Sequence, residues 1–460
     1  GAGAVVHAPM VNHVNNTADT KVPSHLQPFG GLRLMATTMG RLTYSMQIGS
    51  KVHRAIQDVF DQNPSMVADI LSHVGRKDCT AIDPSIIQCI KPRIIDVLQS
   101  ECPSFKVDPP TEDSAMDSML LDLWRTAAKD PDDQAPQWIK HGAPSGIEEP
   151  IQDRGIFPLY DPDEDTAELD FADLATQADF ANYSGVEGDA DVTTEFSRLL
   201  KLHHAKEFPS MRAAKRYLRA DPILSKIGVI KKIRNGKMKS RIVIDSKQSG
   251  ISRATRKYER TQLPRALDVV ADCLSLLSKH RIPVSVQELE FLVADFRDAF
   301  FIVPNRFKER RYFTVSFNGK IIVFTKTTQG SRGAPLTWAR VISLVMRLTQ
   351  AVVGVAACRI STYVDDPLIT AIGSKIERHT TFAMILVIWS SLQLPLAMDK
   401  ATIGSTITWT SATFSPMSDG LIVRVKEAIV SETLEALQSC IKKNLITRKT
   451  LRTILGKTML

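Results

Sequence analysis

The pattern of apolar and polar positions divides the chain near residue 196. Upstream, apolar residues recur at helical spacing in VHRAIQDVF (52–60) and SMVADILSHV (65–74), whereas 103–195 consists of acidic runs punctuated by proline. Such acidic runs are typical of solvated linkers or flexible faces. Downstream, TTEFSRLLKLHHAKEF and SMRAAKRYLRA are basic and predicted to be helical. From there on, helical and strand-like patterns follow one another.

Three hairpins are predicted in the second half. GVIKKIRNGKMKSRIVIDS and RYFTVSFNGKIIVFTK each place an Asn-Gly pair, Asn235-Gly236 and Asn318-Gly319, between two strand-like runs. ITWTSATFS (407–415) is the third, and LEFLVADF (289–296) is a single apolar strand. Helices are predicted over about 264–280, from Pro335 through LTWARVISLVMRL, over 377–392, over about 426–443 and over about 447–459.

Length and composition indicate an intracellular protein of two or more domains. At 460 residues the chain exceeds what one hydrophobic core usually serves. The six cysteines are scattered without a close pair, which favours reduced thiols and an intracellular location, in cytoplasm or nucleus. The beginning of the sequence lacks the features of a secretory signal, and no run reaches 18 apolar residues, so we expect no membrane partner. FAMILVIW (382–389) is predicted to be a buried helix.

The charge is distributed unevenly. The net charge of +8 is the sum of −16 over residues 1–200 and +24 over residues 201–460. A surplus of that size in the second part points to a polyanionic partner, for which nucleic acid is the usual candidate. A basic surface that serves only solubility is the alternative.

The tetrapeptide YVDD (363–366) carries the most informative chemistry. Neighbouring strand residues point to opposite faces, so Asp365 and Asp366 can share a site only at a turn or strand tip. A third acid, Asp295, ends the strand predicted at 289–296. Taken singly, each acid is equally typical of a turn or strand end. Together, carboxylates without nearby His or Cys suit Mg²⁺, and two such ions can activate a primer 3′-hydroxyl and stabilise the leaving pyrophosphate.

Three sequence blocks, in order, resemble the reverse-transcriptase domain of retroviruses and retrotransposons. DFRDAFFIVP (295–304) resembles the first catalytic block, YVDD the second, and TQGSRGAP (328–335) the nucleotide-side block, with Thr328 in place of the usual proline. The resemblance runs from about residue 225 to 460. It implies an α+β right-hand polymerase, with fingers and palm over 196–424, a partial thumb over 425–460, and an acidic, largely helical or irregular region of unknown function over 1–195.

The resemblance also assigns the catalytic and metal-binding roles. Asp295, Asp365 and Asp366 would be catalytic, and they would hold two Mg²⁺ ions together with the backbone carbonyl of Phe296, with Mn²⁺ as a substitute. Asp295 and Asp365 would be the principal ligands and Asp366 a supporting one.

Further residues would bind the incoming nucleotide. The set implied by the resemblance is Arg241, Lys232, Asp298, Ala299, Phe300, Gln329, Gly330 and Lys400. An aromatic ring at Phe300 leaves no room for a 2′-hydroxyl, the group that distinguishes ribo- from deoxyribonucleotides, so dNTP is the expected substrate. Simple core filling is the alternative for Phe300, and Arg234 is the alternative to Lys232. Lys400 in LAMDKATIG would lie near the leaving pyrophosphate, a position suited to a general acid.

Primer and template contacts are predicted at Trp409, Gly456 and Lys457. Trp409 would anchor the hairpin that grips the primer end, and a buried structural tryptophan is the alternative. Gly456 would allow close approach of the backbone to a duplex, and Lys457 would contact phosphate.

The resulting prediction is an RNA-directed DNA polymerase that extends a primer on an RNA or DNA template with dNTPs. Two alternatives stay open: a catalytically inactive nucleic-acid-binding remnant of a retroelement, and an RNA-dependent RNA polymerase. The sequence predicts neither the oligomeric state nor the template preference.

Overall fold

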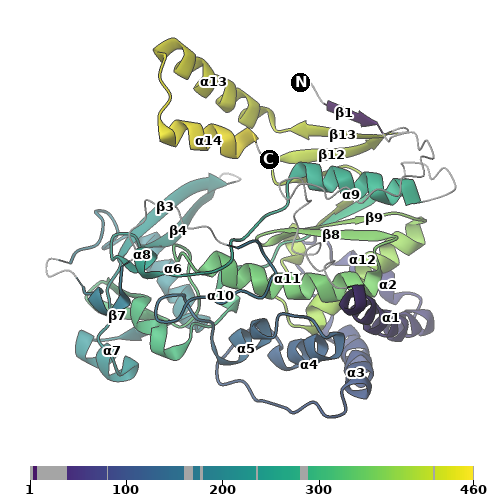
Figure 1. Cartoon of the computed structure of the whole chain (residues 1–460), viewed down its shortest axis with the longest axis horizontal. Helices are drawn as coiled ribbons and strands as arrows, with labels where there is room; N and C mark the ends of the chain where they lie inside the picture. Colours follow the sequence, from purple (N-terminus) through teal and green to yellow (C-terminus); the bar gives the residue numbers. More distant parts are fainter. Residues whose placement is uncertain are drawn as a thin grey trace. The chain divides into compact units, whose positions relative to one another are not determined.

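A computed structural model describes most of the chain, as two compact units that interleave along the sequence (Figure 1). The described residues are 4–7, 39–79, 81–159, 169–176, 180–234, 237–279, 288–417 and 420–458. Unit 1 comprises Gly1–Ser100, Gln262–Arg297 and Met346–Leu460, and unit 2 comprises Glu101–Thr261 and Asp298–Val345. Helix α11 (Ala334–Val353) begins in unit 2 and ends in unit 1.

Unit 1 contains two antiparallel sheets. The first has the strand order β10-β5-β9-β8, and the second has the order β1-β13-β12-β11. The strands of the first sheet are β5 (Glu290–Val293), β8 (Cys358–Tyr363), β9 (Asp366–Ala371) and β10 (Thr402–Gly404). Those of the second are β1 (Ala4–His7), β11 (Ile407–Trp409), β12 (Ala412–Met417) and β13 (Gly420–Val425).

Helix α9 (Ala266–Lys279) packs against both sheets of unit 1 (Figure 1). Its buried side chains, including Val269 and Cys273, share one core with Phe291 of β5 and Phe414 of β12. Because strand side chains alternate between faces, each sheet contributes its inward-facing residues to this core. The core therefore supports both the strand that leads to Asp295 and the hairpin that carries Trp409.

The other helices of unit 1 have the expected amphipathic or buried character. Helix α12 begins with a capping box in which Ser374 and Glu377 satisfy each other's backbone N–H groups, and it is buried over Phe382–Trp389, as predicted for FAMILVIW. Helix α12 covers Lys375–Ser391, and the remaining helices are α1 (Met39–Gln62), α2 (Met66–Ser72), α3 (Pro84–Glu101, whose last residue belongs to unit 2), α13 (Glu427–Lys443) and α14 (Arg448–Thr458), with the 3₁₀ turn η6 (Met398–Lys400).

Unit 2 contains a three-stranded sheet and a separate two-stranded hairpin, both antiparallel. The sheet has the order β2-β7-β6, from β2 (Ala205–Phe208), β6 (Thr314–Phe317) and β7 (Lys320–Phe324). The hairpin pairs β3 (Lys226–Arg234) with β4 (Lys237–Asp245). The helical elements are α4 (Ser118–Ala128), α5 (Gln134–His141), η3 (Phe171–Asp173), α6 (Ala190–Lys201), α7 (Met211–Leu218), α8 (Ile251–Ala254), α10 (Ala299–Ile302) and η5 (Phe307–Tyr312).

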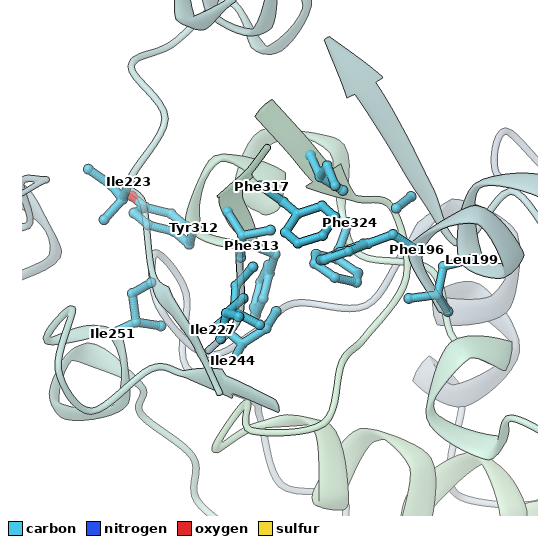
Figure 2. Close-up of a cluster of buried hydrophobic side chains, with 14 of the residues drawn as sticks. Phe196, Leu199, Ile223, Ile227, Ile244, Ile251, Tyr312, Phe313, Phe317 and Phe324 are labelled. Atoms are coloured by element: carbon cyan, nitrogen blue, oxygen red, sulfur yellow. The ribbon is translucent and has the colours of Figure 1, made fainter. Parts of the chain in front are cut away.

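An aromatic cluster forms the main core of unit 2 (Figure 2). Phe196 of α6 lies 4.8 Å from Phe317 and 6.4 Å from Phe324, measured between ring centroids. Ile227 of β3 and Ile244 of β4 reach the same cluster, so the base of the hairpin is anchored on the sheet and on α6. Burying these side chains stabilises the unit by about 1.5–3 kcal/mol for each large residue.

The interpretation of the acidic region as solvated linker is wrong for residues 118–158. Asp122, Asp130 and Asp132 are buried, and Arg340 of α11 donates two hydrogen bonds to Asp132, one of them from Nε at 2.8 Å. The guanidinium of Arg340 also lies 4.6 Å from the ring of Trp138. Buried cations compensate two of these acids: Lys140 donates to Asp122 at 2.6 Å, and Arg340, about 200 residues away and invisible to local composition, compensates Asp132.

Most of the predicted elements are confirmed. The hairpin turn at Asn318-Gly319 has both residues at positive φ, as a two-residue turn requires, and the strands, hairpins and helices of the second half appear within a few residues of their predicted limits. The predicted Asn235-Gly236 turn lies outside the described residues. The segment HHAKEF is not helical: it ends in β2, which pairs with β7. The α+β class is confirmed.

One described helix, α11, is long and apolar enough to cross a membrane by length and composition alone. The protein buries 83% of the apolar stretch, which is the behaviour of a core helix. All six cysteines, each among the described residues, are free.

Candidate active site

The YVDD residues form a tight turn between β8 and β9 in unit 1. Tyr363 pairs with Asp366, which leaves Val364 and Asp365 as the two turn residues. Val364 has a φ of 58°, a left-handed conformation that is uncommon for a β-branched residue. The prediction that the two aspartates lie at a turn or strand tip is therefore confirmed.

Asp295 lies on the strand next to this turn. The amide of Ala294 donates to the carbonyl of Pro367 at 3.1 Å, and the amide of Phe296 donates to the carbonyl of Asp365 at 2.9 Å. These bonds continue the β5–β9 register, in which Val293 pairs with Leu368, and they set Asp295 opposite Asp366. Residues opposite each other in an antiparallel pair project to the same face, so these two carboxylates share one face of the sheet.

The segment 394–397 fixes the other edge of the Asp295 strand. Ala397 donates its amide to the carbonyl of Asp295, and Arg297 donates its amide to the carbonyl of Pro395, both at 2.8 Å. Phe296 is 1% exposed, and its ring packs edge-on against Trp389 of α12 at 5.3 Å. Main-chain hydrogen bonds therefore hold the strand that carries Asp295 along both of its edges, and the packing of Phe296 against Trp389 holds it on one face.

Two basic residues lie beside Asp295. Lys400 donates to the carboxylate of Asp295 at 2.7 Å, with half of the lysine side chain exposed. Arg297 donates to Asp399 at 2.5 Å, and this hydrogen bond holds the pKa of the Asp399 carboxyl below its usual range. The structure thus brings Lys400 to the predicted metal ligand itself.

The donor set suits a hard divalent cation. Asp295 and Asp366 supply oxygens on one face, Asp365 lies at the adjoining turn, and the main-chain bonds fix all three backbones. Among the described residues, no three His, Cys, Asp or Glu side chains are gathered closely enough to hold a metal ion by themselves. Mg²⁺ needs no complete protein cage, because it keeps several waters and takes substrate phosphates as ligands. The residues fit the predicted ions on chemical grounds.

Trp409 is a buried neighbour of the YVDD turn. It is 2% exposed, its indole N–H donates to the carbonyl of Asp366 at 3.0 Å, and its ring meets Tyr363 edge-on at 6.3 Å. Thr410 and Ser411, both at positive φ, form the turn of this hairpin. The burial agrees with the structural alternative for this residue, and a contact between Trp409 and a primer stays a prediction.

In unit 2, Gln329-Gly330 packs against strand β4. The amide of Ile244 donates to the carbonyl of Gln329 at 3.5 Å, and the hydroxyl of Ser246 donates to the carbonyl of Gly330 at 2.6 Å. Gly330 has a φ of 100°, and a Cβ atom there would lie 2.2 Å from the carbonyl oxygen of Ile244. Only glycine fits this position.

The other predicted fingers residues lie on the same hairpin or are only partly described. Arg241 of β4 is exposed and pairs with Ile230, three residues before Ile244. Strand β4 therefore carries Arg241 and also contacts Gln329-Gly330. Lys232 pairs with Lys239 in the ladder, but its side chain, like that of Arg234, lies outside the description. Thr328 is 2% exposed, and its hydroxyl has no hydrogen-bond partner among the described residues.

Asp298, Ala299 and Phe300 open the short helix α10. Ala299 is buried and Phe300 is half-buried. The side chain of Asp298 is taken by Arg198 of α6, which donates to both of its oxygens at 2.7 and 3.1 Å. Sequence reasoning missed Arg198, because it precedes every recognised block and no local signal links it to an acid 100 residues later.

The predicted thumb residues lie on α14. Gly456 is exposed, and a Cβ there would meet nothing within 4 Å. The side chain of Lys457 lies outside the description. Contacts of either residue with a duplex stay predictions, as does the three-part division at residues 195 and 424.

Comparison with known proteins agrees with the motif assignment. Residues 235–445 match the family described as reverse transcriptase (RNA-dependent DNA polymerase). No curated protein matches the chain in sequence.

Similar solved structures come from foamy virus protease–reverse transcriptase. The complex with dsDNA is 14% identical with a TM-score of 0.41, covering 62% of this chain and 49% of that one. The dRH form with dsDNA is 13% identical with a TM-score of 0.44, covering 78% and 55%. The complex with an RNA/DNA hybrid is 12% identical with a TM-score of 0.40, covering 78% and 42%. This chain therefore spans about half the length of these neighbours.

The family match spans all three blocks, from before Asp295 to beyond the YVDD turn and Trp409. The predicted fold class, an α+β polymerase of the right-hand type, agrees with it. Residues 235–445 are therefore similar to a reverse transcriptase domain, and the proteins of that family are polymerases of the nucleotidyltransferase type.

Proposed function

We propose that the protein is an RNA-directed DNA polymerase, which extends a primer with dNTPs by two-metal-ion nucleotidyl transfer. The observation that carries the proposal is the joining of the Asp295 strand to the YVDD turn by the hydrogen bond from Phe296 to Asp365, inside the family match. Because this bond is between main-chain atoms, it fixes the backbones of the acidic residues without using their side chains. This arrangement supports the proposal that the three aspartates act together.

Asp295, Asp365 and Asp366 would hold the metal ions, with the carbonyl of Phe296. When bound, two Mg²⁺ ions supply Lewis acidity at the attacking 3′-hydroxyl and at the leaving pyrophosphate. Lys400, already bonded to Asp295, would neutralise the carboxylate before metal binding and would be available to protonate the leaving group. Arg297 and Asp399 neutralise each other beside the site, so they would leave its charge balance to the three aspartates and Lys400.

The nucleotide would be bound by residues of unit 2. Arg241 is exposed, and a planar guanidinium suits the paired oxygens of a triphosphate. Half-burial of Phe300 leaves part of its ring accessible, as selection against a 2′-hydroxyl would require. A wild-type preference for NTPs over dNTPs would contradict this substrate assignment and favour an RNA polymerase.

The template and primer would be RNA or DNA. The surplus of +24 over residues 201–460 supports a nucleic-acid partner, because neutralising phosphates releases counterions and drives association. Binding should therefore weaken steeply as salt is raised.

Primer extension on poly(rA)/oligo(dT) with Mg²⁺ tests the proposal. Asp365→Asn should lower the extension rate by at least about 10³-fold, because it removes a charged ligand of the metal ions. The matched control is Asp61→Asn on the exposed face of α1, which should extend at the wild-type rate. Extension that survives Asp365→Asn would exclude the mechanism. Wild-type protein that binds the duplex and extends nothing would favour the inactive remnant.

A further inference from the structure

Arg198 of α6 forms the most complete ion-pair cluster beside the predicted nucleotide residues. Its Nη1 and Nη2 donate to the two oxygens of Asp298 at 2.7 and 3.1 Å. Its Nε and Nη2 also donate to Glu195, one turn earlier on α6, at 2.9 and 2.8 Å. All three guanidinium nitrogens are thus engaged, and the hydrogen bonds to Glu195 contribute most to raising the pKa of Arg198.

The pair constrains an unusual backbone conformation. Asp298 is the N-cap residue of α10 and has a φ of 51°, in the left-handed region. An aspartate at an N-cap usually accepts a hydrogen bond from the helix amides, but among the described residues the Asp298 side chain makes no such bond. It points to Arg198 instead, so the side chain that would otherwise cap α10 ties the start of this helix to α6.

The rest of α10 is held from other directions. Thr327 donates its hydroxyl to the carbonyl of Phe300 and its amide to the carbonyl of Val303, the latter at 2.9 Å. The ring of His204 stacks on Phe301 at 4.8 Å with the planes 3° apart. Burial lowers the pKa of His204 to about 4, so the ring is neutral at physiological pH and adds no second cation to the cluster.

Different contacts hold different parts of α10 around Phe300. Thr327 and His204 fix the middle and the far side of α10, whereas Arg198 fixes its first residue, where the chain turns through the left-handed conformation. Side chains at Ala299 and Phe300 follow that turn directly, so their direction depends on the backbone angle of Asp298.

We propose that Arg198 is a positioning residue for nucleotide selection, which sets the direction of Phe300 by holding Asp298. The inference rests on the proposed polymerase function, and it extends the nucleotide site to a helix that lies before the family match, outside residues 235–445. Arg198 acts through Asp298 and makes no contact with substrate in this account.

The test is single-nucleotide incorporation with dTTP and UTP on the same primer–template, for wild type, Arg198→Met and Arg198→Lys. Arg198→Met should raise the KM for dTTP by about 10-fold, change kcat less, and lower the ratio of dTTP to UTP efficiency, because a displaced ring admits the 2′-hydroxyl. Arg198→Lys keeps the charge but loses the two-pronged donor geometry, so it should give an intermediate ratio and fold normally. The control is Arg212→Met on the exposed face of α7, which should match wild type.

A double-variant cycle separates positioning from general stability. Asp298→Asn removes the other half of the pair, so Arg198→Met combined with Asp298→Asn should change selectivity no more than the larger single variant. Additive effects on selectivity, or an unchanged dTTP to UTP ratio in Arg198→Met and Arg198→Lys, would overturn the inference. If wild type itself shows no extension that depends on Asp365, the proposed function falls and takes this inference with it. If wild type extends and the Arg198 variants equal it, the inference alone fails.

Discussion

The two units use the same residue type, the carboxylate, in opposite ways. In unit 2, Asp132, Glu259 and Glu309 are fully buried, and protein groups bond directly to each of them. In unit 1, the side chain of Asp295 is 20% exposed and the acids of the YVDD turn are half-buried. The acids in unit 2 join distant segments of chain, whereas those in unit 1 lie at the end of a strand and in a turn.

The difference lies in which atoms hold each acid in place. Glu259 accepts hydrogen bonds from the amides of Arg154 and Ile156, so its carboxylate itself joins two segments of the chain. Asp295 and Asp365 are positioned through their main-chain carbonyls, which accept hydrogen bonds from the amides of Ala397 and Phe296, respectively. A carboxylate whose oxygens already bond to the protein is not available to bind another ligand. An acid that is positioned by its main chain can bind one ligand and exchange it for another. The comparison predicts that changes in unit 2 will cost stability and changes in unit 1 will cost activity.

Removing the cation from the buried cluster of unit 2 should have the largest effect on folding. Arg340→Met leaves Asp132 and Glu259, both 0% exposed, without their arginine, and it also removes the hydrogen bond to the carbonyl of Gln152 at 2.7 Å. Breaking a buried pair in this way costs about 3–5 kcal/mol. Urea denaturation followed by circular dichroism measures it.

The matched variant is Arg340→Met with Asp132→Asn. Since it removes one of the two uncompensated charges, it should be more stable than the sum of the two single effects predicts. If Arg340→Met unfolds at the same urea concentration as wild type, the buried acids of unit 2 do not hold its segments together, and the comparison fails.

A smaller loss is expected when a buried acid keeps its shape and loses one acceptor. Glu309 accepts the amide of Ser145 at 2.6 Å and that of Glu148 at 3.0 Å, one on each oxygen. In Glu309→Gln, the new NH₂ group faces one of these donors, which should cost about 1–3 kcal/mol. Thermal unfolding measures the loss, and Glu435→Gln on the exposed face of α13 is the control.

The same variant carries a pH signature. Burial raises the pKa of Glu309 above its ordinary value of 4.5, although the two amide donors act in the opposite direction. The folded state then holds the proton more tightly than the unfolded state, so this residue makes wild-type stability fall as pH rises from about 4.5 through the raised pKa. The difference in stability between wild type and Glu309→Gln should narrow over that window. A difference that widens as pH rises would show that the amides dominate.

The strand-and-turn geometry of unit 1 could be predicted because it depends on local signals. Two features can be predicted without knowledge of distant contacts: an apolar strand that leads to Asp295, and a turn at the two aspartates of YVDD. The hairpin at Asn318-Gly319 follows from turn chemistry and strand alternation, and the hairpin over 407–415 is predicted without a turn signal.

The rest could not be predicted, because it depends on partners far apart in sequence. In the sequence, Asp132 is part of an acidic run that looks solvated, and only its contact with Arg340 shows that it is buried. Arg198 likewise looks like a cation on a helix surface, and only the structure shows its bond to Asp298. For Trp409 the sequence leaves two alternatives, an anchor of the hairpin that grips the primer and a buried structural tryptophan, and its 2% exposure and hydrogen bond to the carbonyl of Asp366 agree with the second. Charge runs predict where acids occur along the chain, and the tertiary pairing decides which of them are solvated.

The smallest effect on stability should come from Lys400, because its ion pair with Asp295 leaves half of the lysine side chain in solvent. Exposed pairs contribute about 0–1 kcal/mol, so Lys400→Met should unfold within about 1 kcal/mol of wild type. Its effect on activity should nevertheless be large, because a general acid contributes about 10²-fold or more to kcat, which primer extension measures. Lys400→Arg should retain the ion pair and lose most of the proton transfer, since arginine does not deprotonate.

Lys375→Met, an exposed lysine of α12, is the control for both measurements with Lys400. A different result would also be informative. If Lys400→Met keeps its kcat and needs less Mg²⁺ for half-maximal rate, Lys400 competes with the metal for Asp295 and donates no proton. In that case the comparison of the two units becomes sharper, because the one side-chain bond to Asp295 among the described residues would be one that metal binding displaces.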